Sequence, residues 1–236
     1  LFIGNLSFAQ VNKNLPLGEI EVSPFDFGKM WTFENLPLDY FEKTYGFRPS
    51  EEWIESARMS SLRFASWCSA SFVSPSGLIM TNHHCSRDVV TALQKDGESF
   101  EKNGFVANGY DLERKAEGLF VEQMVKAIDI TAEVKKRTNA AGTDAEKLEL
   151  RGKALEAIKE EYSKKKGWNG LRLQAVTFYS GGKFSLYGYK KYEDIRLVLI
   201  PEGDLGYFGG DPDNFTYPRY NLDCTFFRAS AAGVDI

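Results

Sequence analysis

Short apolar runs bounded by turn residues lie on both sides of a central segment and predict β-strands. The first two runs are separated by Ser74-Pro75-Ser76-Gly77, in which Pro and Gly favour a tight turn. Two later runs are separated by Ser180-Gly181-Gly182, which is typical of a hairpin. The predicted strands cover residues 69–73, 78–81, 171–179, 183–189, 194–201 and 223–229.

The central segment, residues 112–166, has the periodicity of helices. Thr143 and Glu146 have the spacing of a capping box, which predicts the start of a helix. An apolar stripe follows, formed by Leu148, Leu155, Ile158 and Tyr162. Two shorter helices are predicted to begin near Pro37 and after Ser50.

The composition indicates a folded protein. Of the 236 residues, 43% are hydrophobic and 14% aromatic, which is enough for a sizeable core and excludes a disordered chain. The net charge of -4 argues against nucleic acid or an anionic membrane as a partner. No apolar run reaches the ~20 residues that a membrane span needs.

The two ends of the chain predict that it is part of a longer exported protein. Residues 1–10 are short and apolar and contain Ser7-Phe8-Ala9, so we interpret them as the remnant of a signal peptide. An ordinary apolar N-terminus is the alternative. The C-terminal residues RASAAGVDI follow a predicted strand without a closing element.

The chain contains only two histidines, His83 and His84, and they are adjacent. In an extended segment, neighbouring side chains point to opposite faces, so the pair is poorly placed to ligate one metal ion. The spacings HExxH and CxxC, which are typical of zinc sites, are absent from the sequence. We therefore predict neither a metal site nor a cofactor.

A catalytic base is the favoured interpretation of this segment. The run Thr81-Asn82-His83-His84-Cys85 directly follows an apolar strand, and in this it resembles peptidases of the chymotrypsin type. The resemblance implies that His84 is the catalytic histidine and that Cys85 is bonded to Cys68. The hairpin between the two cysteines would bring them close to the ~5.5 Å Cα separation of a disulfide.

A catalytic histidine of this type needs a buried carboxylate that holds its tautomer. Asp223 begins an apolar run that reaches Arg228, as the corresponding aspartate does in the chymotrypsin type. An aspartate in a turn before a strand is the alternative. Cys224 is then left over, and we expect it to be a buried free thiol.

Longer motifs carry a more specific resemblance. From about Gly28 onward, the chain resembles the N-terminal third of the bacterial dipeptidyl-peptidase 7 and dipeptidyl-peptidase 11 family of serine peptidases. The motifs that carry this resemblance are residues 28–32, 68–75, 81–85, 102–105 and 208–219.

The resemblance implies release of dipeptides from the free N-terminus of peptides. Carried over by position, Asn214, Phe215 and Arg219 would bind the α-amino end of the substrate. An Asn side-chain oxygen can accept a hydrogen bond from an ammonium group, whereas Arg has only donors and suits a carbonyl or carboxylate. Many family members have Trp at the position of Phe215. Asp211 and Asp213 favour a turn over a metal site.

The expected fold is mixed β with an α insertion. It is the first β-barrel of a double-barrel, chymotrypsin-like peptidase, formed by residues 11–236, with a helical insertion at about 87–170. The second barrel, the helical domain and the serine nucleophile would lie beyond this chain, which alone would be inactive. The family further implies a periplasmic or cell-surface location and a homodimer at full length.

Two other functions compete with the serine dipeptidyl-peptidase. A non-catalytic, peptidase-like module could hold peptide N-termini, because no nucleophile motif is present in the sequence. An endopeptidase of the trypsin type is disfavoured by the motif around Asn214. The residue preferred next to the cleaved bond, acidic or hydrophobic, is not indicated by the sequence.

Overall fold

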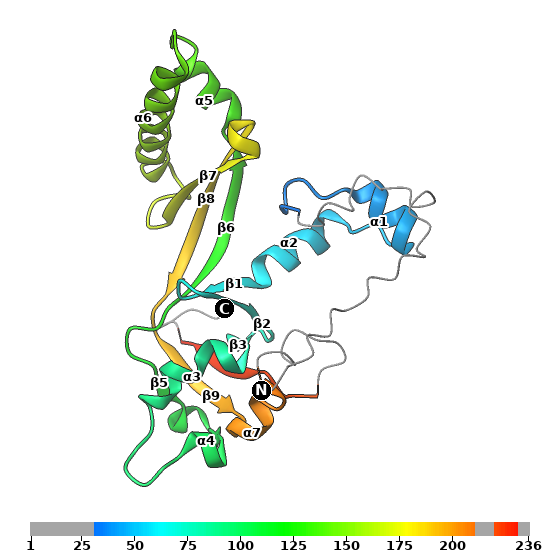
Figure 1. Ribbon diagram of the computed structural model, residues 1–236, viewed down its shortest axis with the longest axis vertical. Helices are drawn as coiled ribbons and strands as arrows, with labels where there is room; N and C mark the ends of the chain where they lie inside the picture. The colour runs from blue at the N-terminus through cyan, green and yellow to red at the C-terminus, as the bar shows by residue number, and fades with distance from the viewer. Residues whose placement is uncertain (1–30, 211–219, 231–236) are drawn as a thin grey trace, which may run out of the picture. The chain divides into compact units, whose positions relative to one another are not determined.

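A computed structural model describes residues 31–210 and 220–230 of the chain (Figure 1). The chain divides into two units, Leu1–Pro37 and Leu38–Ile236. Residues 31–37 of the first unit include a turn in which the Asn35 amide donates to the Thr32 carbonyl at 3.0 Å. The second unit contains all helices and strands named below.

The second unit is built on an antiparallel sheet of ten strands with helices, which confirms the predicted mixture of strands and helices. The strand order is β4-β9-β10-β3-β2-β1-β6-β8-β7, and β5 also pairs with β9. The strands are β1 (Ser61–Phe64), β2 (Cys68–Phe72), β3 (Leu78–Thr81), β4 (Phe105–Val106), β5 (Arg114–Lys115), β6 (Val121–Asp129), β7 (Arg172–Phe178), β8 (Lys183–Tyr192), β9 (Ile195–Ile200) and β10 (Thr225–Ala229).

Two helices precede β1, and the others lie in connections between strands. The helices are α1 (Leu38–Tyr45), α2 (Glu51–Ser60), α3 (His83–Thr91), α4 (Phe100–Asn103), α5 (Thr131–Thr138), α6 (Asp144–Ser163) and α7 (Gly203–Gly206). Ser50 caps α2, since its Oγ accepts from the Trp53 amide at 3.1 Å. Thr143 and Glu146 form the predicted capping box of α6. The three predicted helix starts, near Pro37, after Ser50 and at Thr143, are therefore confirmed.

Both predicted hairpins are present. In the first, Ser71 lies opposite Met80, and Phe72 opposite Ile79. Its turn contains Gly77 with a φ of 73°, a left-handed conformation that favours glycine. In the second hairpin, β7 and β8 pair along their length across the Ser180-Gly181-Gly182 turn. Local turn chemistry was thus sufficient to predict both.

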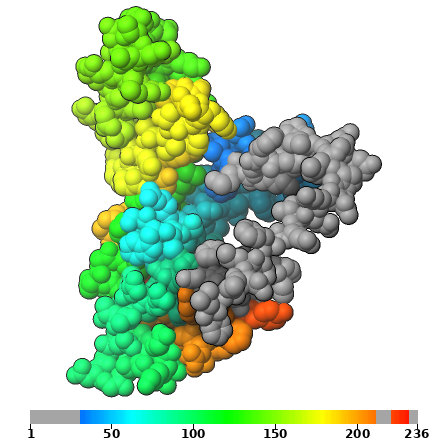
Figure 2. All heavy atoms as spheres, in the orientation of Figure 1, coloured from blue at the N-terminus to red at the C-terminus, as the bar shows by residue number. Residues whose placement is uncertain are grey.

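The hydrophobic residues form two separate cores. The first lies among the strands around β3, β9 and β10, and its fully buried members include Phe64, Ile79, Val121, Ile195, Leu197 and Phe227. The second lies between α5, α6 and the β7–β8 hairpin, and its buried members are Ile130, Val134, Ile158, Trp168, Phe184 and Leu186. Figure 2 shows the yellow surface of the hairpin directly against the green surface of these helices.

β6 and β8 connect the two cores. The first residues of β6 pair with β1, while nearly all of the strand pairs with β8. Val121 at the start of β6 belongs to the first core, and Ile130 just beyond its end belongs to the second. On β8, Tyr192 belongs to the first core and Leu186 to the second. Figure 1 shows the two long strands side by side.

The prediction that residues 112–166 are helical was wrong in part. α5 and α6 are present, but β6 occupies Val121–Asp129. It pairs with both β1 and β8 and is therefore part of the ten-stranded sheet. The Val and Ile residues of this stretch favour a strand, a signal that the helical interpretation overlooked.

The predicted apolar stripe of α6 is also shorter than expected. Ile158 is fully buried, and Leu155 and Tyr162 pack against the second core. Leu148 is 60% exposed, because it lies in the first turns of the helix, beyond the packed part. Among the described residues, no helix is long and apolar enough to cross a membrane.

The contrast between Ile158 and Leu148 gives a test of the second core. Ile158→Ala should lower the free energy of unfolding by about 2–5 kcal/mol, because a fully buried side chain leaves a cavity. Leu148→Ala should change it by less than about 0.5 kcal/mol. Urea unfolding of both variants measures the difference. Equal effects would contradict the burial described above.

Candidate active site

The candidate site lies where β3 ends and β10 begins. Because the two strands are antiparallel, Thr81 at the end of β3 lies opposite Thr225 at the start of β10. His84 follows Thr81 by three residues, and Asp223 precedes Thr225 by two. Sheet register therefore brings two residues that are far apart in the chain to the same end of the sheet.

The segment after β3 is helical, which corrects the expectation of an extended chain. Asn82 is the N-cap of α3, and His83 and His84 are its first two residues. Adjacent residues on a helix lie about 100° apart rather than on opposite faces. His83 is accordingly buried, with 3% exposure, while the His84 side chain remains 35% exposed.

His84 and Asp223 are in direct contact. The Nδ1 atom of His84 lies 3.1 Å from Oδ1 and 3.0 Å from Oδ2 of Asp223. The Asp223 side chain is only 3% exposed. An ionised carboxylate has acceptors only, so Nδ1 must donate and the neutral imidazole then carries its lone pair on Nε2. This is the tautomer in which a histidine can act as a general base.

Asp223 also serves as the cap of α3. His84 is the second residue of α3, and its backbone amide donates to Oδ1 of Asp223 at 3.2 Å. The side chain of Asn82 makes no capping hydrogen bond and instead donates to Oδ2 of Asp223 at 2.9 Å. The carboxylate thus occupies the position of a capping oxygen, where the helix dipole favours negative charge.

Buried hydroxyl groups attach the same helix to β10 and join β3 to β2. Ser86 Oγ donates to Thr225 Oγ1 at 2.8 Å, and both residues are completely buried. Thr81 Oγ1 donates to the Ser69 carbonyl at 2.8 Å. These bonds join α3 to β10 and β3 to β2, the elements around the dyad, and the sequence pattern predicted no such role for any of these residues.

A disulfide joins Cys68 to Cys85, next to His84. The Cα atoms are 6.1 Å apart, and the bond closes the β2–β3 hairpin onto the first turn of α3. The indole Nε1 of Trp67 donates to the Cys85 carbonyl at 3.0 Å. Cys224 is a free thiol but is only half-buried, and its pKa is raised first by desolvation and then by the charge of Asp223.

Within the described residues, Cys68, His84 and Cys85 are the one group with atoms close enough to hold a metal ion. Both sulfur atoms are bonded to each other in the disulfide and cannot act as thiolates. The donor set therefore does not fit a resident metal in this oxidation state.

His83, the histidine to which the sequence motifs give no catalytic role, has a distinctive environment. Its Nδ1 has no hydrogen-bond partner within residues 31–210 and 220–230. Burial lowers the pKa of its imidazole, against the opposing charges of Asp223 and Glu101. The ring also lines a cavity of about 280 Å³, together with Arg87 and Glu101.

Three predicted site residues fall outside the described part of the chain. Asn214, Phe215 and Arg219, with Asp211 and Asp213, belong to residues 211–219. Their predicted roles stay predictions.

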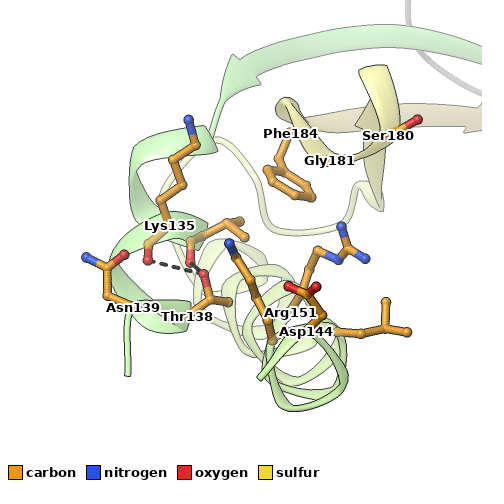
Figure 3. A pocket seen from close by; sticks show the side chains of 11 residues that line it. Lys135, Thr138, Asn139, Asp144, Arg151, Ser180, Gly181 and Phe184 are labelled. Atoms are coloured by element: carbon orange, nitrogen blue, oxygen red, sulfur yellow. Dashed lines mark hydrogen bonds between the residues drawn. The ribbon is translucent and has the colours of Figure 1, made fainter. Parts of the chain in front are cut away.

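A second cavity lies in the other region of the unit (Figure 3). It measures about 420 Å³ and lies between α5, α6 and the turn at Ser180, with the Phe184 ring pointing into it. Lys135, Lys147 and Arg151 give it a basic lining, with Asp144 as the one carboxylate. It shares no residue with the His84–Asp223 dyad.

Comparison with known sequences decides the family. The sequence model of the Peptidase S46 family matches residues 25–233. The chain belongs to this family. The S46 match includes His84, Asp223, both disulfide cysteines and the three residues of the 211–219 segment predicted to bind substrate.

Curated relatives of this S46 chain are dipeptidyl-peptidases. It is 29% identical over 209 residues to a dipeptidyl-peptidase 7 of Porphyromonas endodontalis, which covers 86% of the chain and 25% of that protein. It is 33% identical over 195 residues to an Asp/Glu-specific dipeptidyl-peptidase of Capnocytophaga gingivalis, and this match covers 80% of the chain and 27% of that protein. The chain thus spans about a quarter of the length of these relatives.

Solved structures give the same result. The structure of Porphyromonas endodontalis DPP11 in complex with substrate matches with a TM-score of 0.67 and 25% identity, over 85% of this chain and 31% of that one. The complex of the same protein with the dipeptide Arg-Glu matches with a TM-score of 0.62 and 28% identity, over 75% of this chain and 26% of that one. The fold of the S46 chain is therefore that of this part of DPP11.

The buried His83 predicts a pH dependence of stability. Because its pKa is lowered in the folded state, the unfolded state binds a proton first as the pH falls below the usual histidine value of about 6.5. The stability of the native chain should therefore decrease below that pH, and His83→Phe should remove this part of the decrease. Urea midpoints measured from about pH 5 to 8 test it. Identical slopes for both proteins would contradict the buried, neutral ring.

Proposed function

We propose that the chain is the N-terminal part of a serine-type dipeptidyl-peptidase and supplies its catalytic base and orienting carboxylate. The observation that carries the proposal is the contact of His84 Nδ1 with the buried Asp223 carboxylate, at 3.0 and 3.1 Å. The relatives named dipeptidyl-peptidase support the reaction class. A chymotrypsin-like first barrel, formed by the sheet around β3, β9 and β10, is the fold we propose for this part.

In the proposed reaction, a serine elsewhere in the complete protein attacks the second peptide bond of the substrate. Nε2 of His84 accepts the hydroxyl proton and then delivers it to the amine that leaves. Water repeats the sequence on the acyl-enzyme and releases the dipeptide. Asp223 stays ionised, holds the imidazole in the required tautomer and stabilises the imidazolium that forms. Such proton transfer contributes roughly 10²–10⁴-fold to the rate.

The surface around the dyad supports a larger enzyme. Several large hydrophobic residues in the segments next to His84 and Asp223 are more than half exposed. These are Trp67, Leu205, Phe208, Tyr220 and Leu222. A contiguous exposed apolar surface is typical of a region that is covered by substrate or by another part of the protein. We propose that the second barrel and the substrate cover them.

Recognition of the substrate N-terminus is assigned to the segment that begins after α7. We propose that Asn214 accepts from the α-ammonium group, that Phe215 packs against the substrate and that Arg219 donates to a substrate carbonyl or carboxylate. Peptides with a free N-terminus are then the substrates. The dipeptide in a solved relative, Arg-Glu in DPP11, is of this class.

We further propose that the protein is exported to the periplasm or the cell surface and that it forms a homodimer at full length. The Cys68–Cys85 bond supports export, because disulfides persist mainly in oxidising compartments. The interpretation of residues 1–10 as a signal remnant agrees with this location.

The complete gene product that contains this chain tests the role of the dyad. Asp223→Asn should lower kcat about 10⁴-fold on a dipeptidyl amide reporter, because a neutral amide no longer selects the productive tautomer. Asp88→Asn is the matched control, since its side chain on α3 is fully exposed, and it should keep native activity. A loss of less than about tenfold in Asp223→Asn would contradict the proposed role.

Blocking the substrate distinguishes the proposed exopeptidase from its alternatives. A peptide with a free N-terminus should lose its first two residues, whereas its N-acetylated form should not be cleaved, as mass spectrometry can show. Cleavage of both forms would indicate an endopeptidase. Binding of the free peptide without cleavage, by a complete protein that has no serine in a glycine-rich loop, would indicate the non-catalytic module.

A further inference from the structure

His83 is the buried neighbour of the proposed catalytic base. Its imidazole lies directly against Gly206, the last residue of α7. A Cβ atom placed on Gly206 would lie 2.6 Å from Cδ2, 2.7 Å from Cγ and 2.8 Å from Nε2 of His83. Real Cβ contacts essentially never approach so closely. The ring of His83 therefore rests on the bare backbone of α7.

Other contacts hold the same turn against the same helices. The Arg87 guanidinium, one turn further along α3, lies 5.7 Å from the centre of the Tyr207 ring. A Cβ atom on Gly203, at the start of α7, would collide with the Glu101 carboxylate of α4. Gly206 has no positive φ, so it is the lack of space beside the His83 ring, and not the backbone conformation, that excludes a side chain there.

α7 is in turn bonded to the chain that leads into Asp223. The Leu222 amide donates to the Leu205 carbonyl at 2.7 Å. Leu222 is the residue before Asp223, and Leu205 is the residue before Gly206. These contacts close a ring. His83, the neighbour of His84, contacts Gly206, and Leu205 beside Gly206 is hydrogen-bonded to Leu222. Leu222 precedes Asp223, which contacts His84.

We propose that His83 is a positioning residue for the His84–Asp223 dyad, acting through its contact with Gly206 and the α7 turn. This inference rests on the proposed function only where it concerns activity. The placement of the dyad itself can be measured without any substrate.

The unpartnered Nδ1 is consistent with a role that depends on the shape of the ring. A buried donor or acceptor without a partner costs about 1–3 kcal/mol. Among the described residues, hydrogen bonding of Nδ1 therefore does not explain why a histidine is buried at this position. Its flat ring fills the space between α3 and Gly206. Removing it would open the neighbouring cavity of about 280 Å³ onto α7 and allow the turn to shift.

The proton on His84 Nδ1 provides the substrate-free measurement. Because the chain has only two histidines, ¹⁵N-histidine labelling gives side-chain signals from His83 and His84 alone. In the native chain, the His84 Nδ1 proton should be observed as a downfield signal, since Asp223 holds it in a hydrogen bond. Gly206→Ala and His83→Ala should each broaden or remove that signal. His83→Phe, which restores a flat ring, should retain it.

Activity of the complete gene product gives the second measurement. Gly206→Ala should lower kcat by about tenfold to a hundredfold, as expected for a small displacement of catalytic groups, with KM changed less than about twofold. His83→Ala should act in the same direction. The double variant should recover at least about threefold in kcat over Gly206→Ala, because the new methyl group enters the space that the ring has left.

Two controls separate positioning from general destabilisation. Gly152→Ala adds a methyl group in α6 where no atom lies within 4 Å, and it should leave the signal and kcat unchanged. Ile158→Ala lowers stability through the second core, and it too should leave both unchanged at temperatures where it remains folded.

A retained His84 signal in folded His83→Ala would overturn the proposal, as would additive effects of Gly206→Ala and His83→Ala. If Gly206→Ala does not fold, the comparison of His83→Ala with His83→Phe still decides. If the complete protein cleaves no peptide while the signal responds as described, the proposed function fails and the positioning role stands.

Discussion

The pairing of β3 with β10 is the constraint on which the rest of the structure depends. Thr81 and Thr225 lie opposite each other, and this register alone determines that His84 and Asp223 emerge at the same end of the sheet. A shift by one residue would turn every side chain of the strand to the other face. Ile79 and Phe227, both fully buried, would then leave the core, so hydrophobic burial and dyad geometry select the same register.

The strands and turns near the site could be predicted because their signals are local. Pro75 and Gly77 indicate a turn, and the apolar runs beside them indicate the two strands of a hairpin. His84, Asp223 and the Cys68–Cys85 pair followed from short motifs whose residue types and order resemble those of one class of enzyme. The structure places His84 and Asp223 in contact and contains the disulfide.

Other features could not be predicted, for two different reasons. For α3 and β6 the signals were present but were outweighed. Asn82 is a favoured N-cap residue, and the Val and Ile residues of 121–129 suit a strand, although the wider pattern predicts an extended first segment and a helical second one. The roles of Asn82, Ser86 and Gly206 had no local signal at all. They arise from contacts with residues more than a hundred positions away along the chain.

Asp223 has two roles in this structure. It is the orienting carboxylate of the proposed dyad, and it also caps α3 through the His84 amide. Residues used only for catalysis commonly reduce stability, so a lineage that loses activity is free to replace them. Here the replacement would leave a helix end without its acceptor and Asn82 without its partner. Descendants of this fold that abandon peptide cleavage should therefore keep the aspartate long after they discard the imidazole, and its presence in a relative is weaker evidence of an active enzyme than the presence of the histidine.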